Sequence, residues 1–327
     1  MSAGESAPRA GGSPQSARHE VGARDLGETQ IGPVTFVWGA RTYVMGIVNV
    51  TPDSFSGDGV LRPVSRLDEP APNAGASAAD ATVDAAVATA VAQARRMVAE
   101  GADLLDVGGE STRPGHLPVD EAEELRRVVP VIRAIRAALP AIPISVDTTK
   151  PRVAAAALDA GAACINDVWG TGASDVLPRL AAEEGAAYVL MHNRAEARYG
   201  DLVPEVVADL ERAIERALAA GVPWGSIIVD PGIGFGKTME HNLLLLRDLA
   251  ALQVLGRPIL LGTSRKSTIG RVLGGVPPAE RLEGTLATTA LGIAAGVDIV
   301  RVHDVMANVR VARMCDAILR GREEAGG

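Results

Sequence analysis

Eight short apolar runs in this sequence each end in residues that can ionise or form hydrogen bonds. The residues at or just after these ends are Asn49, Asp106, Asp147, Asn166, His192, Asp230, Ser264 and Arg301. A structural scaffold does not need polar groups at all eight positions, because burying them without partners costs free energy. The pattern therefore indicates one polar site assembled from the ends of eight elements.

Three of these residues offer acceptor oxygens to a single ligand. Asp147, Asn166 and Asp230 carry carboxylate or amide oxygens, which suit a ligand edge rich in N–H donors, such as an aminopyrimidine ring. Considered alone, Asp147 is about as well explained as the N-cap of a following helix as it is by ligand binding. Asn166 considered alone could form an Asx turn. Because such explanations would have to hold at all eight ends at once, we favour the binding site.

A second group of residues suits an anion. Arg301 and His303 alternate along the last run and so share a face, where with Asn49 they could hold a phosphate or pyrophosphate, with a metal ion as an option. The segment Ser264-Arg-Lys-Ser267 precedes a helix, whose free N–H groups and dipole attract anions. Alone, His192 and His303 would more often be structural residues. No residues have the spacing of a structural zinc site, and no Ser-His-Asp triad is indicated.

Lysine is rare in this chain and marks the same positions. Only three of the 32 basic residues are lysines, and Lys150, Lys237 and Lys266 each follow closely after an apolar run. Lysine is a compact cation on a flexible stem and contacts a ligand as a point charge. Compositional bias and chance are the alternative explanation. If the runs are parallel strands, all three lysines lie on one rim of one sheet.

The apolar runs alternate with segments of helical periodicity. The runs lie at 44–50, 103–107, 143–147, 163–168, 187–191, 227–230, 258–262 and 298–302, and the helical segments at about 80–100, 119–139, 151–161, 174–184, 204–220, 240–254, 279–296 and 305–319. Continuous apolar runs are typical of parallel strands buried on both faces. Eight strand–helix units predict an α/β fold, the (β/α)8 TIM barrel, with its site at the carboxyl ends of the strands. The alternative is a doubly wound open sheet, but the first run lacks the glycine-rich turn of that fold.

Three segments lie outside the strict alternation. A β-hairpin is predicted before the barrel, in which 34–38 turns at Gly39-Ala40 into the strand at 42–50. Residues 1–30 are rich in Gly, Ser, Ala, Pro and charge and predict a disordered tail. Residues 31–322 are predicted to form a single barrel domain, with a loop insertion at about 60–80.

The bulk composition excludes several classes of protein. Hydrophobic residues make up 47% and charged residues 22% of the chain, which is typical of a globular protein with a sizeable core. The net charge of −8 argues against a nucleic-acid or membrane-surface partner, although a local cluster of cations can still bind a small anion. No secretory signal or membrane span is visible, so a cytoplasmic location is expected. Cys164 lies in an apolar run and is expected to be a buried thiol rather than part of a disulfide with Cys315.

At the same residues the chain closely resembles the dihydropteroate synthases. The segments that carry the resemblance are Met45-Gly-Ile-Val-Asn-Val-Thr-Pro-Asp-Ser-Phe-Ser56, Gly108-Gly-Glu-Ser-Thr-Arg-Pro-Gly115, Asp230-Pro-Gly-Ile-Gly-Phe-Gly-Lys237, Gly262-Thr-Ser-Arg-Lys-Ser267 and Arg301-Val-His-Asp304. The likeness runs from about residue 34 to 320 and keeps the order of the family. It implies a TIM-barrel transferase that joins 4-aminobenzoate to 6-hydroxymethyl-7,8-dihydropterin pyrophosphate, releasing pyrophosphate and forming 7,8-dihydropteroate for folate synthesis.

The resemblance also implies a role for each site residue. The pterin ring would be held by Asp147, Asn166, Asp230 and Lys266, of which Asp147, Asp230 and Lys266 would be catalytic. Pyrophosphate would be held by Asn49, Arg301 and His303, with Asn49 acting through Mg²⁺. Thr112 and Arg113 would belong to the second loop, which closes over the substrates. Pro114, Phe235 and Ser267 would line the aminobenzoate pocket, which is also the sulfonamide pocket. Of the three lysines we then expect only Lys266 to be a direct ligand, whereas Lys237 orders its loop and Lys150 begins the third helix.

The resemblance leaves alternatives and departures. Family members are usually homodimers through their late helices, so a homodimer is expected. The first loop reads Gly57-Asp58 where the family commonly has Asp-Gly, and Thr268 stands where the family often has Phe. A pterin-binding methyltransferase barrel is one alternative, but it would not need the Arg-Val-His run at 301–303. A non-catalytic pterin-binding paralogue is the other, against which the intact anion site argues.

Overall fold

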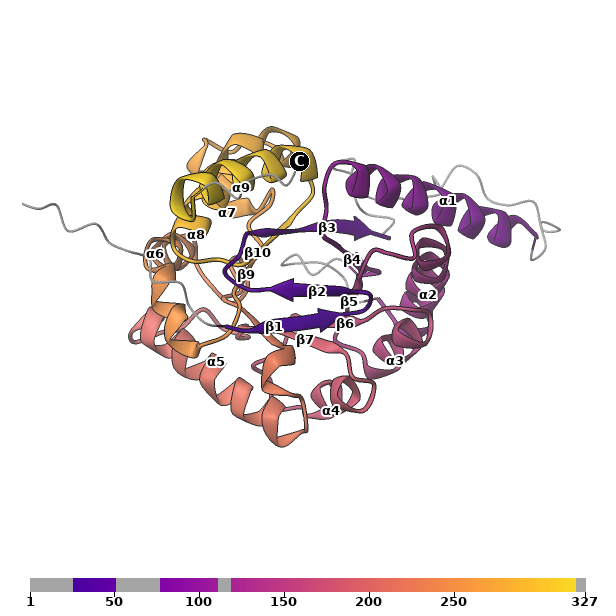
Figure 1. The fold of residues 1–327 in the computed structure, drawn as a ribbon, viewed down its shortest axis with the longest axis horizontal. Helices are drawn as coiled ribbons and strands as arrows, with labels where there is room; N and C mark the ends of the chain where they lie inside the picture. The colour runs from indigo at the N-terminus through magenta and orange to yellow at the C-terminus, as the bar shows by residue number, and fades with distance from the viewer. Residues whose placement is uncertain (1–25, 51–76, 111–118, 322–327) are drawn as a thin grey trace, which may run out of the picture.

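The computed structural model describes residues 26–50, 77–110 and 119–321, and its centre is a closed barrel of parallel strands (Figure 1). The strands are β3 (Tyr43–Asn49), β4 (Leu104–Gly108), β5 (Ile144–Asp147), β6 (Cys164–Asp167), β7 (Ala187–Met191), β8 (Ile227–Asp230), β9 (Leu260–Leu261) and β10 (Ile299–Val302). They pair in the order β8-β7-β6-β5-β4-β3-β10-β9. A parallel bridge between Val229 and Ile259 joins β8 to β9 and closes the ring. The TIM barrel is thereby confirmed, and the open doubly wound sheet is excluded.

A ring of helices surrounds the strands (Figure 1). They are α1 (Ser77–Ala99), α2 (Glu121–Ala138), α3 (Pro151–Asp159), α4 (Val176–Glu183), α5 (Leu202–Ala219), α6 (Met239–Arg247), α7 (Ser267–Val272), α8 (Leu282–Ala294) and α9 (Val305–Leu319). In α5 the buried side chains Val206, Leu210 and Ala217 recur at helical spacing and pack on the barrel. The segment expected to be one helix at 240–254 ends its α-helical part at Arg247 and continues as a 3₁₀ helix, Leu249–Leu255. The short α7 is additional to the eight helical segments expected.

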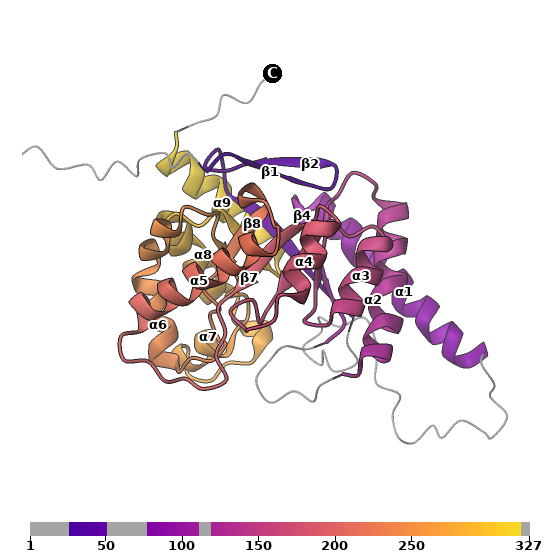
Figure 2. The same cartoon turned by 90° about the horizontal axis from the view of Figure 1, so that it is seen from below.

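The N-terminal hairpin is present, but its strands are not the two expected. β1 (Glu28–Ile31) pairs antiparallel with β2 (Val34–Val37), whereas the expected partner, Tyr43–Asn49, is the first barrel strand. Figure 2 shows the hairpin lying across one end of the barrel. Phe36 stacks on Trp38 at 5.7 Å between ring centroids and packs against Tyr43 at 4.7 Å. These rings close the amino ends of the strands with apolar groups.

The inward side chains change character along each strand. Next to the hairpin they are apolar and form one buried cluster that includes Met45, Leu104, Cys164, Ile228, Leu260 and Ile299. Side chains in a strand alternate between the two faces, so the residue two positions further along points inward again. At the carboxyl ends these next residues are Asp106, Asn166, Asp230, Gly262 and Arg301. The barrel interior is therefore apolar at the hairpin end and polar at the opposite end, which we call the mouth.

Several expectations concern segments at the edges of the described chain. Most of the expected tail at 1–30 and of the expected insertion at 60–80 lies outside the described residues. Within the described residues, Glu28–Ile31 belongs to β1 and Ser77 begins α1. Among the described helices, none combines the length and the apolar character that a membrane crossing requires. Cys164 is buried as expected, and burial raises the pKa of its thiol to about 12.

Candidate active site

One guanidinium lies between two carboxylates at the centre of the mouth. Arg301 Nε donates to Asp106 Oδ2 at 2.5 Å, and Arg301 Nη2 donates to Asp147 Oδ2 at 2.6 Å. Asn166 Nδ2 donates to the same Asp106 oxygen at 3.1 Å. Both carboxylates are buried, and Asp106 has no exposed surface. Four strands, β4, β5, β6 and β10, thus bring their inward polar residues into one hydrogen-bonded cluster.

Each of the two carboxylates in this cluster has one oxygen without a hydrogen-bond partner among the described residues. Asp106 Oδ1 and Asp147 Oδ1 are buried and have no hydrogen-bond partner among the described residues. Burial raises the pKa of Asp147 to about 7, and the charge of Asp106 adds to this, while Arg301 opposes it. Buried acceptor oxygens of this kind are suited to a ligand that brings N–H donors.

Asp230 and Lys266 face each other across the next part of the mouth. A Cβ built on Gly262 would lie 3.8 Å from Asp230 Oδ2, 4.0 Å from Lys266 Nζ and 4.0 Å from Arg301 Cβ, so these three residues surround one point. Burial raises the pKa of Asp230, and burial lowers the pKa of Lys266 to about 8. Glycine at 262 therefore leaves space between a carboxylate and two cations.

Lys266 also connects the mouth to the loop that follows β8. Its Nζ donates to the carbonyl oxygen of Ile233 and lies 4.5 Å from the centre of the Phe235 ring. Ser267, the next residue, is the first residue of α7, and Thr268 is buried behind it. Lys266 is thus in contact with Phe235, and Ser267 follows Lys266 at the start of α7.

The residues expected to bind an anion lie on the same side as Arg301. Ser264 Oγ lies 2.9 Å from His303 Nδ1 and accepts a hydrogen bond from the His303 backbone N–H at 3.1 Å. Asn49 ends β3, which pairs with β10 and β4, and it shares the inward face with Met45. Asp304 is the residue before α9, but its side chain makes no capping hydrogen bond and pairs with Arg265 instead, at 2.7 Å.

The donor set at Asn49 determines which metal this side of the mouth could take. Among the described residues, no three acidic, histidine or cysteine side chains gather as metal ligands. Asn49 offers one amide oxygen, and Mg²⁺ commonly takes one or two protein oxygens and completes its shell with phosphate oxygens and water. The residues present therefore fit a Mg²⁺ ion that arrives with a phosphate ligand, and do not fit a dedicated protein cage.

The simpler explanations for single residues fail at several positions. The N-cap of α3 is Lys150, so Asp147 is free of that role, and the side chain of Asn166 bonds Asp106 rather than its own backbone. Lys150 begins the third helix as expected, and its ammonium pairs with Glu110 and, at 2.5 Å, with the buried Glu124. Thr112, Arg113 and Pro114 lie outside the described residues. Of the three lysines, only Lys266 lies at the centre of the mouth.

Asp106 is a site residue to which the sequence assigned no role. It ends the second apolar run, and it follows Leu104 by two positions on the inward face. A charged residue at an inward position of a completely buried strand is the signal that could have identified it. The sequence also gave no reason to group Lys237 with His192, whose side chains meet at the edge of the mouth.

The barrel with its polar mouth is that of a pterin-binding enzyme, as the match to a family model shows. The family model described as "Pterin binding enzyme" matches residues 73–303. The dihydropteroate synthase of Clostridium beijerinckii is 46% identical over 292 residues, which cover 89% of this chain and 99% of that protein. The chain belongs to the dihydropteroate synthase family.

Solved structures of dihydropteroate synthases agree with this assignment. The Clostridium difficile enzyme in the presence of pteroic acid superposes with a TM-score of 0.76 at 47% identity, covering 87% of this chain and 99% of that chain. The Xanthomonas albilineans enzyme with 4-aminobenzoic acid gives a TM-score of 0.73 at 42% identity, covering 85% and 93%. The relatives are matched along nearly their whole length.

Proposed function

We propose that this mouth joins 6-hydroxymethyl-7,8-dihydropterin pyrophosphate to 4-aminobenzoate, releasing pyrophosphate and forming 7,8-dihydropteroate. The observation that carries the proposal is that Asp230, Lys266 and Arg301 surround Gly262 and that Arg301 also bonds the buried Asp147. The four residues come from four different barrel strands or strand ends, and each is a group that the two substrates need. The protein is a transferase.

The pterin ring is assigned to the acceptor oxygens. Its aminopyrimidine edge presents N–H donors, and Asp147 and Asp230 offer buried carboxylate oxygens, one of which, Asp147 Oδ1, has no partner among the described residues. Asn166 and Lys266 complete the proposed pterin set, with Asn166 held by Asp106. The protonated amine of Lys266 suits a ring oxygen or nitrogen acceptor.

The pyrophosphate group is assigned to the β10 side of the mouth. Arg301 uses Nε and Nη2 on the two carboxylates, which leaves Nη1 for a phosphate oxygen. His303 and Asn49 would add an imidazole and an amide, and Asn49 would hold a Mg²⁺ ion bound to the pyrophosphate. That ion would neutralise part of the charge that builds up on the leaving group.

The proposed reaction needs no covalent enzyme intermediate. The bond between the pterin methylene carbon and the pyrophosphate oxygen breaks, and the positive charge that develops is spread over the pterin ring. Asp147 and Asp230 favour that charge from fixed positions in a buried site. The amino nitrogen of 4-aminobenzoate then bonds to the methylene carbon and loses a proton. Phe235 and Ser267, with Thr112, Arg113 and Pro114, would form the aminobenzoate pocket, where sulfonamides would compete.

Two properties beyond the reaction are also proposed. We expect a homodimer formed through the late helices, because Leu291 on α8 and Met314 and Ile318 on α9 are large apolar residues with exposed fractions between 63% and 68%. A cytoplasmic location is the second expectation. Light scattering at micromolar concentration tests the first property, and a monomer would contradict it.

The decisive assay measures pyrophosphate release. Release that requires both 4-aminobenzoate and the pterin pyrophosphate would support the proposed reaction, whereas a methyltransferase or a non-catalytic pterin-binding protein would release none. Asp230→Asn should abolish turnover and pterin binding, because it removes a buried negative charge that faces Lys266. Unchanged affinity of Asp230→Asn for the pterin pyrophosphate in calorimetry would contradict the assignment of Asp230.

A further inference from the structure

The loop between β8 and α6 lies directly against the segment that follows β7. Gly232, Gly234 and Gly236 have φ values of +68°, +86° and +51°, a region that favours glycine. A Cβ on Gly232 would collide with the carbonyl oxygen of His192, and one on Gly236 would collide with that of Arg194. The loop can approach this segment so closely only because these two positions are glycine.

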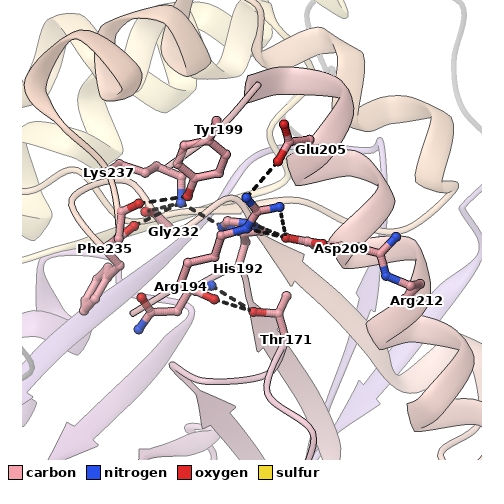
Figure 3. Close-up of polar contacts among 12 residues, drawn as sticks. Thr171, His192, Arg194, Tyr199, Glu205, Asp209, Arg212, Gly232, Phe235 and Lys237 are labelled. Carbon is pink, nitrogen blue, oxygen red and sulfur yellow. Dashed lines mark hydrogen bonds and ion pairs between the residues drawn. The ribbon is translucent and has the colours of Figure 1, made fainter. Parts of the chain in front are cut away.

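The side chain of Lys237 links this loop to His192 through three contacts (Figure 3). Its Nζ lies 3.1 Å from the carbonyl oxygens of both Gly232 and Phe235, and 2.8 Å from His192 Nδ1. Burial lowers the pKa of Lys237 to about 7. In its protonated form the group has three N–H donors and no acceptor. All three donors are therefore used within the protein, and none is left for a substrate.

His192 sets the direction of the Lys237 ammonium. Because its Nδ1 accepts from Lys237, its Nε2 carries the hydrogen and donates to Asp209 Oδ2 on α5 at 3.1 Å. The imidazole is completely buried, and burial, together with the charge of Lys237, lowers the pKa of His192 to about 4, so the ring is neutral. Asp209 is held in turn by Arg194 at 2.8 Å and by Arg212 (Figure 3).

The opposite side of the same loop faces the mouth. The carbonyl oxygen of Ile233 accepts from Lys266, and the Phe235 ring lies 4.5 Å from the Lys266 ammonium. The loop is therefore clamped between two ammonium groups, one in the mouth and one outside it. Any change in the position of Lys237 reaches the Phe235 ring through the Phe235 carbonyl oxygen that Lys237 binds.

We propose that Lys237, oriented by His192 and Asp209, is a positioning residue that holds the Phe235 ring and the Ile233 carbonyl in place for the aminobenzoate half of the site. The inference rests on the proposed function, because it takes Phe235 to line that pocket. Among the residues assigned to the pterin, Asp147, Asn166 and Arg301 take part in hydrogen bonds around Asp106 and not with this loop. Asp230 and Lys266 do contact the loop, because Asp230 accepts from the Gly232 N–H at 2.7 Å and Lys266 donates to the Ile233 carbonyl oxygen. Lys237 should therefore affect 4-aminobenzoate more strongly than the pterin.

The test compares the two substrates in Lys237→Met, which keeps the aliphatic stem and removes the charge. We expect the KM for 4-aminobenzoate to rise at least tenfold, with kcat and the calorimetric affinity for the pterin pyrophosphate changed less than threefold. Arg212→Ala, at the exposed end of the same set of contacts, is the matched control and should leave both substrates unaffected. An unchanged KM for 4-aminobenzoate in Lys237→Met would overturn the proposal.

Variants of His192 test whether His192 acts on the aminobenzoate site through Lys237. His192→Leu removes the acceptor of the ammonium, and His192→Gln supplies an oxygen in its place, so Gln should restore part of the aminobenzoate affinity that Leu loses. If His192 acts through Lys237, adding His192→Leu to Lys237→Met should raise the KM for 4-aminobenzoate little further. Additive effects, or equal loss of both substrates, would contradict the positioning role. Failure of wild-type protein to release pyrophosphate would instead refute the proposed reaction itself.

Discussion

The molecule contains two buried sets of charges that differ in how well they are partnered. The mouth cluster, Asp106, Asp147, Asp230, Lys266 and Arg301, places carboxylates at the barrel centre and leaves two of their oxygens without a described partner. The anchor network, His192, Arg194, Asp209 and Lys237, bonds each charge to its neighbours. Burial raises the pKa of Asp147, whereas for Asp209 the hydrogen bonds from Arg194 and His192 outweigh burial and lower the pKa.

The difference shows what each set can do. A buried carboxylate with too few partners destabilises the free protein, and a ligand with N–H donors relieves that cost on binding. A fully partnered network has nothing left to offer a ligand, and it fixes the backbone to which it is attached. The mouth cluster is thus suited to binding, and the anchor network to positioning.

The largest effect is expected at the residue that holds the mouth cluster together. Arg301→Gln leaves Asp106 and Asp147 facing each other without the shared cation, and removing one partner of a buried ion pair typically costs about 3–5 kcal/mol of unfolding free energy. Urea denaturation measures this loss, and calorimetry should show that pyrophosphate binding is lost as well. A variant as stable as the wild type would mean that the two carboxylates are not charged together.

The next largest effect is expected at Asp147, where the substitution should stabilise the protein rather than destabilise it. Asp147→Asn should reduce turnover by about 1000-fold or more and yet raise the Tm at pH 8, because Asp106 and Arg301 remain paired. The folded pKa of Asp147 is raised from 3.8 to about 7, so its ionisation opposes folding fully above pH 7 and not at all below about pH 4. Between these values the native protein binds more protons than the unfolded chain, and this contribution to stability falls as pH rises.

Tm measured from pH 4 to pH 8 checks this prediction for Asp147→Asn against the wild type. The advantage of the variant should be greatest at pH 8 and disappear near pH 4. The groups that face Asp147 are Arg301, Asp106, Glu124 and Lys266, and all are unchanged in the variant. A lower Tm at pH 8 would show that Asp147 is well partnered in the free protein, and would remove the contrast with the anchor network.

The sequence was sufficient for the barrel because its strands are buried on both faces. Each apolar run coincides with a strand to within about two residues, and the alternation of runs and helical segments defines the order around the barrel. The partner of β2 was misplaced because Glu28–Ile31 is only four residues long and three of its residues are polar. The helix α7 was expected only from the segment Ser264-Arg-Lys-Ser267 that precedes it, and it was not among the periodic segments because six residues are too few to show helical periodicity.

The sequence predicts which residues lie at the site, but not which of them form hydrogen bonds with one another. Residues at the carboxyl ends of barrel strands must lie near one another, so Asp147, Asn166, Asp230 and Arg301 follow from the fold. Which of them bond depends on the stagger of strands far apart in sequence, and Arg301 and Asp106 are 195 residues apart. The contact between Lys237 and His192 depends in the same way on two loops whose approach is allowed by glycines.

A smaller effect on stability is expected in the anchor network, where removing a carboxylate should lower the Tm rather than raise it as at Asp147. Asp209→Asn removes the charge that faces His192 and Arg194 but keeps an acceptor oxygen, so the KM for 4-aminobenzoate should rise less than in Lys237→Met. The pKa of Asp209 is lowered in the folded protein, so its contribution to stability is present above its unfolded pKa and is lost as pH falls.

The Tm of Asp209→Asn should therefore lie below that of the wild type at pH 8, and the two should converge in acid. Together with Asp147→Asn this gives a pair of carboxyl-to-amide changes with opposite effects on stability at the same pH. If both changes moved the Tm in the same direction, the two sets of charges would not differ in the way described.

The smallest effect is expected where the charges are paired but exposed. Arg179 Nη2 lies 2.6 Å from Asp175 Oδ2 one turn away along the chain, a distance like that between Arg301 and Asp147. Both side chains are about half exposed or more, so water screens the pair, and such pairs contribute little to stability. Arg179→Ala should shift the Tm by less than about 1 °C and leave both substrates unaffected. A larger shift would mean that the distance between charged groups determines their effect on stability in this protein, whether or not the groups are buried.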